Sequence, residues 1–426
     1  MLVLYVCLAI SPSISSPPVK PVVHLAELLD ETRRKNPQVR AAEARARADA
    51  AAVEPAAALD DPMVMLQLWN MPIDLSNVPL MLNVTQWIPL GGKRGARADE
   101  ARAMAAGSRA EVSTRARDVE SEVARAYFDL FLADRTIEVD DEIAATLRSL
   151  VAAASARVSA GRGEQAEVLR AQSEELKVES DREAARARRA AAVAKLVALL
   201  DRAPGSDLGR TSEPGLLTEL PAFQTLRARA LRERPELAVA QAASGAAEAR
   251  VRLAQAAVIP DLGLSAGEMH LFGGSMSPSD FLFLGVQVNL PVFQEKNRAR
   301  VDSAQAGVDA ARADAEALQA RVSAEIQDAL AEVTAETRQA ELHHHLIPLS
   351  RQAFDSALAS YAAGRGSFAM VLDAQRDLQM HELDLAMHLA SYAQHLADLE
   401  RAVGGDVGLV RAAESGARVS HQEQVP

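Results

Sequence analysis

Histidine is the residue type whose spacing in this chain best suits chemistry. His343–His345 form an uninterrupted run, and His381, His388 and His395 follow at intervals of seven residues. If the chain turns back on itself near Gly364, the run lies level with a point between His381 and His388. Imidazoles at one height on two facing helices can bind a soft or borderline cation, or respond to pH.

A simpler interpretation is that these histidines hydrogen-bond separately along a polar wall, and we favour it. We therefore predict no metal site. If one exists, its candidate ligands are His343, His344, His381 and His388. The rest of the sequence offers no nucleophile–base pair, phosphate-binding loop or catalytic metal spacing. We predict a protein that is not an enzyme, that holds no cofactor and that, at a net charge of −12, does not bind nucleic acid.

Long helices must position these side chains. The sequence is 49% hydrophobic but only 4% aromatic, which is typical of Ala-rich helices rather than of a compact core. No proline occurs between Lys93 and Val158, and apolar residues recur three or four apart, with Asp140 as the one gap in the seam. This pattern predicts a supercoiled helix roughly 100 Å long. A second such helix begins near Lys296, and His343 takes the position equivalent to Asp140.

An internal duplication relates these two helices. The segment Val158–Gln172 resembles Tyr361–Gln375, and both contain Ala-Gly-Arg-Gly. Glycine supplies the left-handed backbone of a helix stop and a tight reversal. Each half therefore ends in a long antiparallel helical hairpin. The openings of the two halves also match, since Asn36-Pro37 and Arg234-Pro235 each precede an Ala-rich helix.

Four segments of period two interrupt the helices. They are residues 62–69, 79–88, 260–270 and 280–290. In the last, Leu282, Leu284 and Val286 alternate with small or polar residues. Strands of about ten residues with one apolar face are typical of membrane β-barrels, although a soluble hairpin domain or sandwich edge is an alternative. Because four strands cannot close a barrel and open edges are prohibitive in lipid, membrane insertion would require several chains to share one barrel.

These features define the expected domain organisation. Residues 1–21 resemble a secretory leader, since an apolar run is followed by Ser/Pro-rich sequence. The first repeat, residues 22–204, holds a helix, strands 62–69 and 79–88, a long helix 93–160 and a return helix 164–201. A linker, residues 205–220, leads to the second repeat, residues 221–404, with a helix, strands 260–270 and 280–290, a long helix 295–363 and a return helix 366–403. We expect residues 405–426 to form a flexible tail.

The sequence resembles the TolC-type outer-membrane efflux channels, and within them the metal-efflux branch most. The features that carry the resemblance are the duplication, the helix openings, the hairpin turns and the strand ends at Ile88–Gly92 and Leu290–Phe293. The resemblance covers nearly all of the chain after about residue 22. It implies a mainly α fold with a transmembrane β part. Duplicated helical hairpins would form an α-barrel across the periplasm, and each chain of a homotrimer would add four strands to a twelve-strand outer-membrane β-barrel.

The same resemblance implies functional residues. The family's periplasmic gate has a tyrosine before the second turn and aspartates after it, and Tyr361 and Asp373 match two of these positions. Met370 stands at a further aspartate position, so a double acidic ring is not expected. The hairpin tips would contact a periplasmic adaptor, and their residues are Gly161, Arg162, Gly163, Gly364, Arg365 and Gly366.

The implied function is the passive exit duct of a tripartite efflux system, whose inner-membrane pump is of the RND type and whose barrel lies in outer-membrane lipid. Heavy-metal cations or small toxic compounds would be the cargo. The duct of a type I protein-secretion system is an alternative within the family. A soluble periplasmic coiled-coil scaffold is an alternative of another class, and the proline-bracketed strands speak against it.

Overall fold

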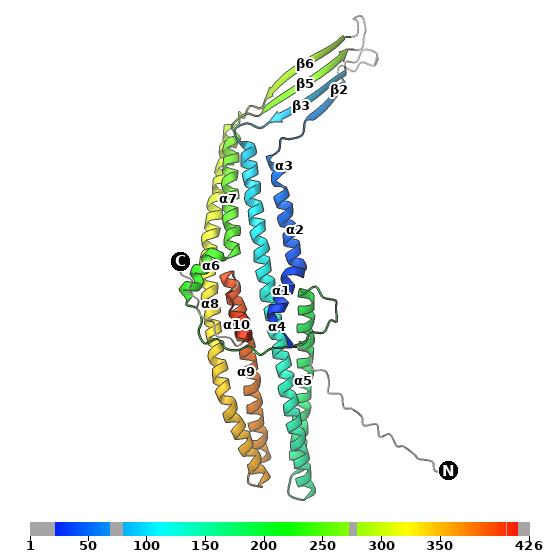
Figure 1. Ribbon diagram of the computed structural model, residues 1–426, viewed down its shortest axis with the longest axis vertical. Coiled ribbons are helices and arrows are strands. Elements are labelled where there is room, and N and C mark those ends of the chain that lie inside the picture. Colours follow the sequence, from blue (N-terminus) through cyan, green and yellow to red (C-terminus); the bar gives the residue numbers. More distant parts are fainter. Residues whose placement is uncertain (1–21, 69–79, 272–278, 406, 416–426) are drawn as a thin grey trace, which may run out of the picture.

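The computed structural model describes residues 22–68, 80–271, 279–405 and 407–415, so the predicted leader, residues 1–21, lies outside the described part. The molecule is elongated, with a sheet at one end and two helical hairpin tips at the other (Figure 1). In the part of the chain that the structure describes, no helix is both long and apolar enough to cross a membrane.

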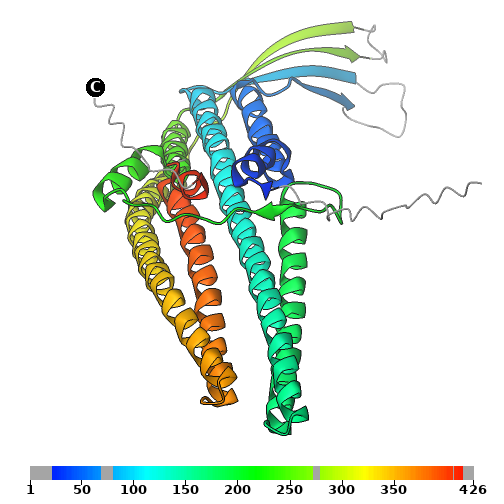
Figure 2. The same cartoon turned by 60° about the horizontal axis from the view of Figure 1, so that its bottom comes forward.

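Two helical hairpins form the lower part of the molecule. The first joins α4 (Lys93–Ser159) to α5 (Gln165–Leu199), and the second joins α8 (Gln294–Ala362) to α9 (Phe368–Val403). The hairpins lie side by side, and α4 packs against α9 between them (Figure 2). At a rise of 1.5 Å per residue, α4 and α8 are each roughly 100 Å long. Most of the predicted seam of α4 is buried, and Asp140 within it is fully buried.

Shorter helices flank the upper halves of α4 and α8. They are α1 (Leu25–Lys35), α2 (Pro37–Ala51), α3 (Val53–Ala57), α6 (Phe223–Glu233) and α7 (Pro235–Ala256). Proline at the first position favours the start of α2 and of α7 because its fixed φ suits a helix and its missing N–H would be unpaired there.

The two helix openings are anchored in the same way. Asn36 Oδ1 accepts a hydrogen bond from the backbone N–H of Gln38 at 2.8 Å, and Asn36 Nδ2 donates to the carbonyl of Leu199 at 2.8 Å. In the second half, Arg234 Nη1 donates to the carbonyl of Ala402 at 3.1 Å. Each opening is thus tied to the end of its own return helix, although one anchor is an amide and the other a guanidinium.

The four strands form one antiparallel sheet in the order β2-β3-β5-β6. The strands are β2 (Met63–Leu68), β3 (Leu80–Ile88), β5 (Leu262–Leu271) and β6 (Ser279–Val288). Val84 of β3 pairs with Ala266 of β5, so the centre of the sheet joins the two halves of the chain. Trp69 and Pro79, at the ends of predicted strands, lie outside the described residues.

One face of this sheet is apolar and uncovered. Leu282 and Leu284 of β6 are 88% and 89% exposed, and Val64, Leu66 and Val286 are also exposed. Among the described strands, β2 and β6 each have a neighbour on one side only. The sheet therefore presents apolar side chains and two open hydrogen-bonding edges.

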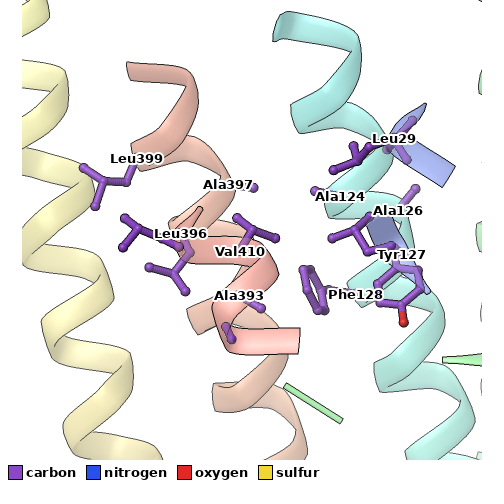
Figure 3. Packing of buried hydrophobic residues seen from close by; sticks show 14 of the residues in the cluster. Leu29, Ala124, Ala126, Tyr127, Phe128, Ala393, Leu396, Ala397, Leu399 and Val410 are labelled. Carbon is purple, nitrogen blue, oxygen red and sulfur yellow. The ribbon is translucent and has the colours of Figure 1, made fainter. Parts of the chain in front are cut away.

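The main hydrophobic core lies at the waist, where α1, α4, α9 and α10 (Leu409–Ser415) meet. Figure 3 shows Phe128 of α4 facing Ala393 of α9 and Val410 of α10. The Tyr127 and Phe128 rings are fully buried, and the Tyr127 hydroxyl donates to the carbonyl of Val23 at 2.9 Å. Tyr127 and Phe128 thus fix the waist.

One prediction about a connecting segment needs correction. The tail predicted as flexible over 405–426 includes α10, whose Leu409, Val410 and Ala413 are buried, so the prediction is wrong for residues 409–415. These apolar side chains share one face of a short helix, a pattern too brief to stand out in the sequence. Within the predicted linker, β4 (Arg210–Thr211) pairs in parallel with β1 (Val22–Val23) across the waist.

Candidate functional site

The hairpin tips have nearly identical turns. Gly161 and Gly364 have φ values of +69° and +71°, which favour glycine. The N–H of Arg162 donates to the carbonyl of Arg157 at 2.8 Å, and the N–H of Arg365 donates to the carbonyl of Ser360 at 2.9 Å. These bonds close the last helical turn. The side chains of Arg162 and Arg365 are exposed, and Gly163 and Gly366 follow them in equivalent positions.

Tyr361, a predicted gate residue, bridges the two hairpins. Its side chain is buried, and its hydroxyl donates to Glu167 Oε2 of α5 at 2.9 Å. The Arg157 guanidinium of α4 lies 4.4 Å from the ring centre and donates to the Tyr361 carbonyl at 2.7 Å. Burial, together with the bond to Glu167, raises the pKa of Tyr361 to about 12, so the hydroxyl stays a donor at neutral pH.

A second bridge lies further from the tips. Arg376 of α9 binds Glu174 of α5 through two parallel hydrogen bonds, Nε to Oε1 at 3.0 Å and Nη2 to Oε2 at 2.6 Å. The side chain of Glu174 is only 8% exposed, and the hydrogen bonds from Arg376 hold its pKa below the usual range. This bidentate, charge-assisted pair is the strongest polar link that the structure shows between α5 and α9.

A weaker contact follows above it. Gln379 Nε2 of α9 donates to Asp140 Oδ1 of α4 at 3.2 Å. Among the described residues Asp140 Oδ2 has no partner, and burial, followed by repulsion from Asp181, raises the pKa of Asp140 to about 6. The polar contacts at Tyr361, Arg376 and Asp140 thus line the part of the junction between the hairpins that lies toward the tips.

Asp373, the other predicted gate residue, does not join this junction. Its side chain is 71% exposed, and its carboxylate lies 3.6 Å from Arg376 Nη1 within α9. The sequence reasoning missed Glu167, Arg157 and Glu174, because a pairing between hairpins leaves no trace in the sequence. The sequence feature that pointed to a polar contact between the hairpins was Asp140, a charged residue in an otherwise apolar seam.

The structure brings together three of the four histidine candidates. The His343 ring lies 5.3 Å from that of His381 and 5.2 Å from that of His388, measured between ring centres. The His343 Nδ1 atom also lies 4.0 Å from Asp384 Oδ2. His344 is exposed and points elsewhere, with its ring 6.1 Å from that of His345.

The described geometry defines a class of protein: a chain of duplicated long hairpins that carries a small apolar sheet at one end, as expected for an outer-membrane channel subunit. Comparison with known families agrees. The family model described as outer membrane efflux protein matches residues 28–202 and 226–405, and the chain belongs to this family. It is an outer-membrane efflux channel with a helical periplasmic extension.

Known proteins show the same likeness. The cobalt-zinc-cadmium resistance protein CzcC of Cupriavidus metallidurans is 25% identical over 292 residues, which cover 68% of this chain and 69% of CzcC. A crystal structure of CusC superposes with a TM-score of 0.78 at 20% identity, covering 92% of this chain and 96% of CusC. The outer-membrane channel OprN also gives a TM-score of 0.78, at 21% identity over 89% of this chain and 90% of OprN. The predicted resemblance to TolC-type channels is confirmed.

Proposed function

We propose that three copies of this chain assemble into the exit duct of a tripartite efflux system. The observation that carries the proposal is the open, apolar sheet, whose edge strands β2 and β6 lack an outer neighbour among the described residues. Unpaired backbone groups are prohibitive in lipid. Pairing β6 of one copy with β2 of the next satisfies both edges, and three copies of four strands close a twelve-strand barrel.

The helical repeats, residues 22–204 and 221–404, supply the periplasmic part. In the proposed trimer α4, α5, α8 and α9 of each copy line a tunnel through which cargo diffuses passively. The tips at 161–163 and 364–366 contact an adaptor protein, since Arg162 and Arg365 are exposed there and can pair with carboxylates. An inner-membrane pump of the RND type supplies the energy, so this chain performs no chemistry.

We place the gate at the junction between the hairpins. The bonds from Tyr361 to Glu167 and from Arg376 to Glu174 join the α8–α9 hairpin to α5. Breaking them frees the tip of the second hairpin to move, which widens the tunnel near the tips. Asp373 is exposed at this level, and three copies around a narrow pore lower the local potential and attract cations.

Heavy-metal cations are the proposed cargo. CzcC carries cobalt, zinc and cadmium resistance in its name, and it is 25% identical to this chain. The periplasmic scaffold considered from sequence gains no support from a sheet with an apolar, uncovered face.

A deletion strain tests the proposal. Cells that lack the chain are compared with cells carrying it on a plasmid, on media containing cobalt, zinc or cadmium and on media containing organic toxicants. We expect the deletion strain to be sensitive to the metals and the plasmid to restore growth. Sensitivity to organic compounds alone, or retention of an exported protein, contradicts metal cargo.

A further inference from the structure

The second hairpin contains a polar cluster that the gate and the tips do not use. It comprises His343 of α8 and His381, Asp384 and His388 of α9, and we call it the histidine cluster. His343, His381 and Asp384 each offer one ligand atom, and these atoms lie within 4.8 Å of one another. All three residues are partly buried and come from one pair of packed helices in one chain.

Two imidazole nitrogens in the cluster lack a hydrogen bond within the described part of the chain. The Nδ1 atoms of His343 and His381 are buried, and among the described residues neither has a hydrogen bond. Buried polar atoms are normally paired, so an orphaned pair indicates an absent ion or water.

His388 is held in the orientation typical of a metal-binding imidazole. Its Nδ1 lies 2.6 Å from Glu336 Oε2 of α8. A carboxylate on one ring nitrogen fixes the tautomer and leaves Nε2 with the lone pair for another partner. With its ring 5.2 Å from that of His343, His388 stands at the edge of the same cluster.

We propose that His343, His381 and Asp384 bind a divalent cation of borderline softness, such as Zn²⁺ or Co²⁺, with His388 or water as the fourth ligand. Two or three imidazoles with a carboxylate form a donor set that suits these ions better than Mg²⁺ or Ca²⁺. Metal–ligand bonds of about 2.0–2.1 Å place tetrahedral ligand atoms roughly 3.3 Å apart. The ligand atoms now lie within 4.8 Å of one another, and small side-chain rotations bring them to this separation.

This site deepens the proposed function and rests on it for its purpose, because the bound ion would be the exported cargo. Asp384 is 35% exposed, so the site is open on one side and an ion can enter and leave. A duct needs such weak, accessible binding rather than a closed structural site.

The test is Co²⁺ binding to the full chain purified in detergent, followed by visible absorption, with Zn²⁺ added as a competitor. We expect one Co²⁺ per chain with the intense absorption of tetrahedral coordination. His343→Gln and His381→Gln should each weaken binding about tenfold or more. The matched control is the double variant His344→Gln/His345→Gln, whose exposed imidazoles lie next to the cluster on the same helix; its affinity should be unchanged.

Two further measurements keep the outcome decisive. Thermal unfolding identifies a variant that binds poorly because it is misfolded. Asp384→Asn, at a partly exposed position, removes the negative charge of one ligand with the least risk to folding. Wild-type protein that does not bind Co²⁺, or cluster variants that bind as wild type does, would overturn the site. The deletion strain's metal sensitivity is independent of this result, so a failed site and a failed cargo assignment can be told apart.

Discussion

The bond pair between Arg376 and Glu174 should hold the tunnel closed. Replacing Arg376 with Met keeps an unbranched aliphatic side chain but removes the guanidinium, so Glu174, which is only 8% exposed, loses its bidentate partner. If the gate is the junction between hairpins, this substitution should favour the open channel, because no other bidentate ion pair joins α5 to α9 in the described part of the chain.

The size of the effect follows from the two bonds. Each charge-assisted hydrogen bond contributes about 1.5–3 kcal/mol when well shielded. Arg376 is 48% exposed, so solvent screening reduces the pair to about 2 kcal/mol in total. A loss of about 2 kcal/mol raises the ratio of open to closed hairpins roughly 30-fold in each chain. Glu174→Gln retains neutral hydrogen bonding and should have a smaller effect of about 1 kcal/mol.

Single-channel recording in planar lipid bilayers measures this change directly. Arg376→Met should spend more time in high-conductance states than wild type, with Glu174→Gln between them. Arg182→Met is the matched control: Arg182 Nη1 binds Asp141 Oδ1 at 2.8 Å within the first hairpin, so its loss should not open the channel. If Arg376→Met conducts as wild type does, or if Arg182→Met opens the channel equally, the bridge does not act as a gate.

Three further substitutions test other parts of the structure. Asp140→Asn should raise the melting temperature at pH 7.5, because it removes a buried charge that costs about 3 kcal/mol. The pKa of Asp140 is raised from 3.8 to about 6, so this difference between variant and wild type should vanish as the pH falls through that window. An unchanged difference at pH 4 would contradict the assignment. Leu284→Arg, on the exposed apolar face of β6, should make the free energy of insertion into the outer membrane about 2–4 kcal/mol less favourable. Gln287→Arg, on the other face, should insert as wild type does, and the amount of each variant in fractionated outer membranes measures the difference. Gly364→Ala should destabilise the tip by about 1 kcal/mol, because the backbone there has φ of +71°. Gly307→Ala, in open space within α8, should instead stabilise the protein. Equal shifts of the two melting temperatures would contradict the role given to the positive φ of Gly364.

The overall architecture could be predicted because it follows from local patterns. Heptad spacing in α4, alternation in β6 and the repeated Ala-Gly-Arg-Gly turns each specify an element within a short stretch of sequence. Their observed ends lie within two residues of the predicted ones, as for β6, which ends at Val288 rather than residue 290. Helix ends and strand ends commonly shift by this amount, because terminal residues are held by few hydrogen bonds.

The polar contacts between hairpins could not be predicted in the same way. Glu174 and Arg376 are far apart in sequence, and their pairing depends on how the two hairpins are placed side by side. The histidine cluster could be predicted in part. Counting residues from the turn predicted that His343 lies level with His381 and His388, but the orphaned Nδ1 atoms and the approach of Asp384 depend on side-chain orientation. α10 escaped prediction because its burial depends on a surface made by α9 and α1.

A cryo-electron microscopy reconstruction of the purified full chain tests the proposed exit duct most directly. We expect threefold symmetry, a closed barrel of twelve strands in which β6 of one copy pairs with β2 of the next, and a helical tunnel that narrows at Tyr361 and Arg376. A single copy with its sheet edges covered by its own residues, or an assembly in which β2 and β6 of different copies do not pair, would contradict the duct.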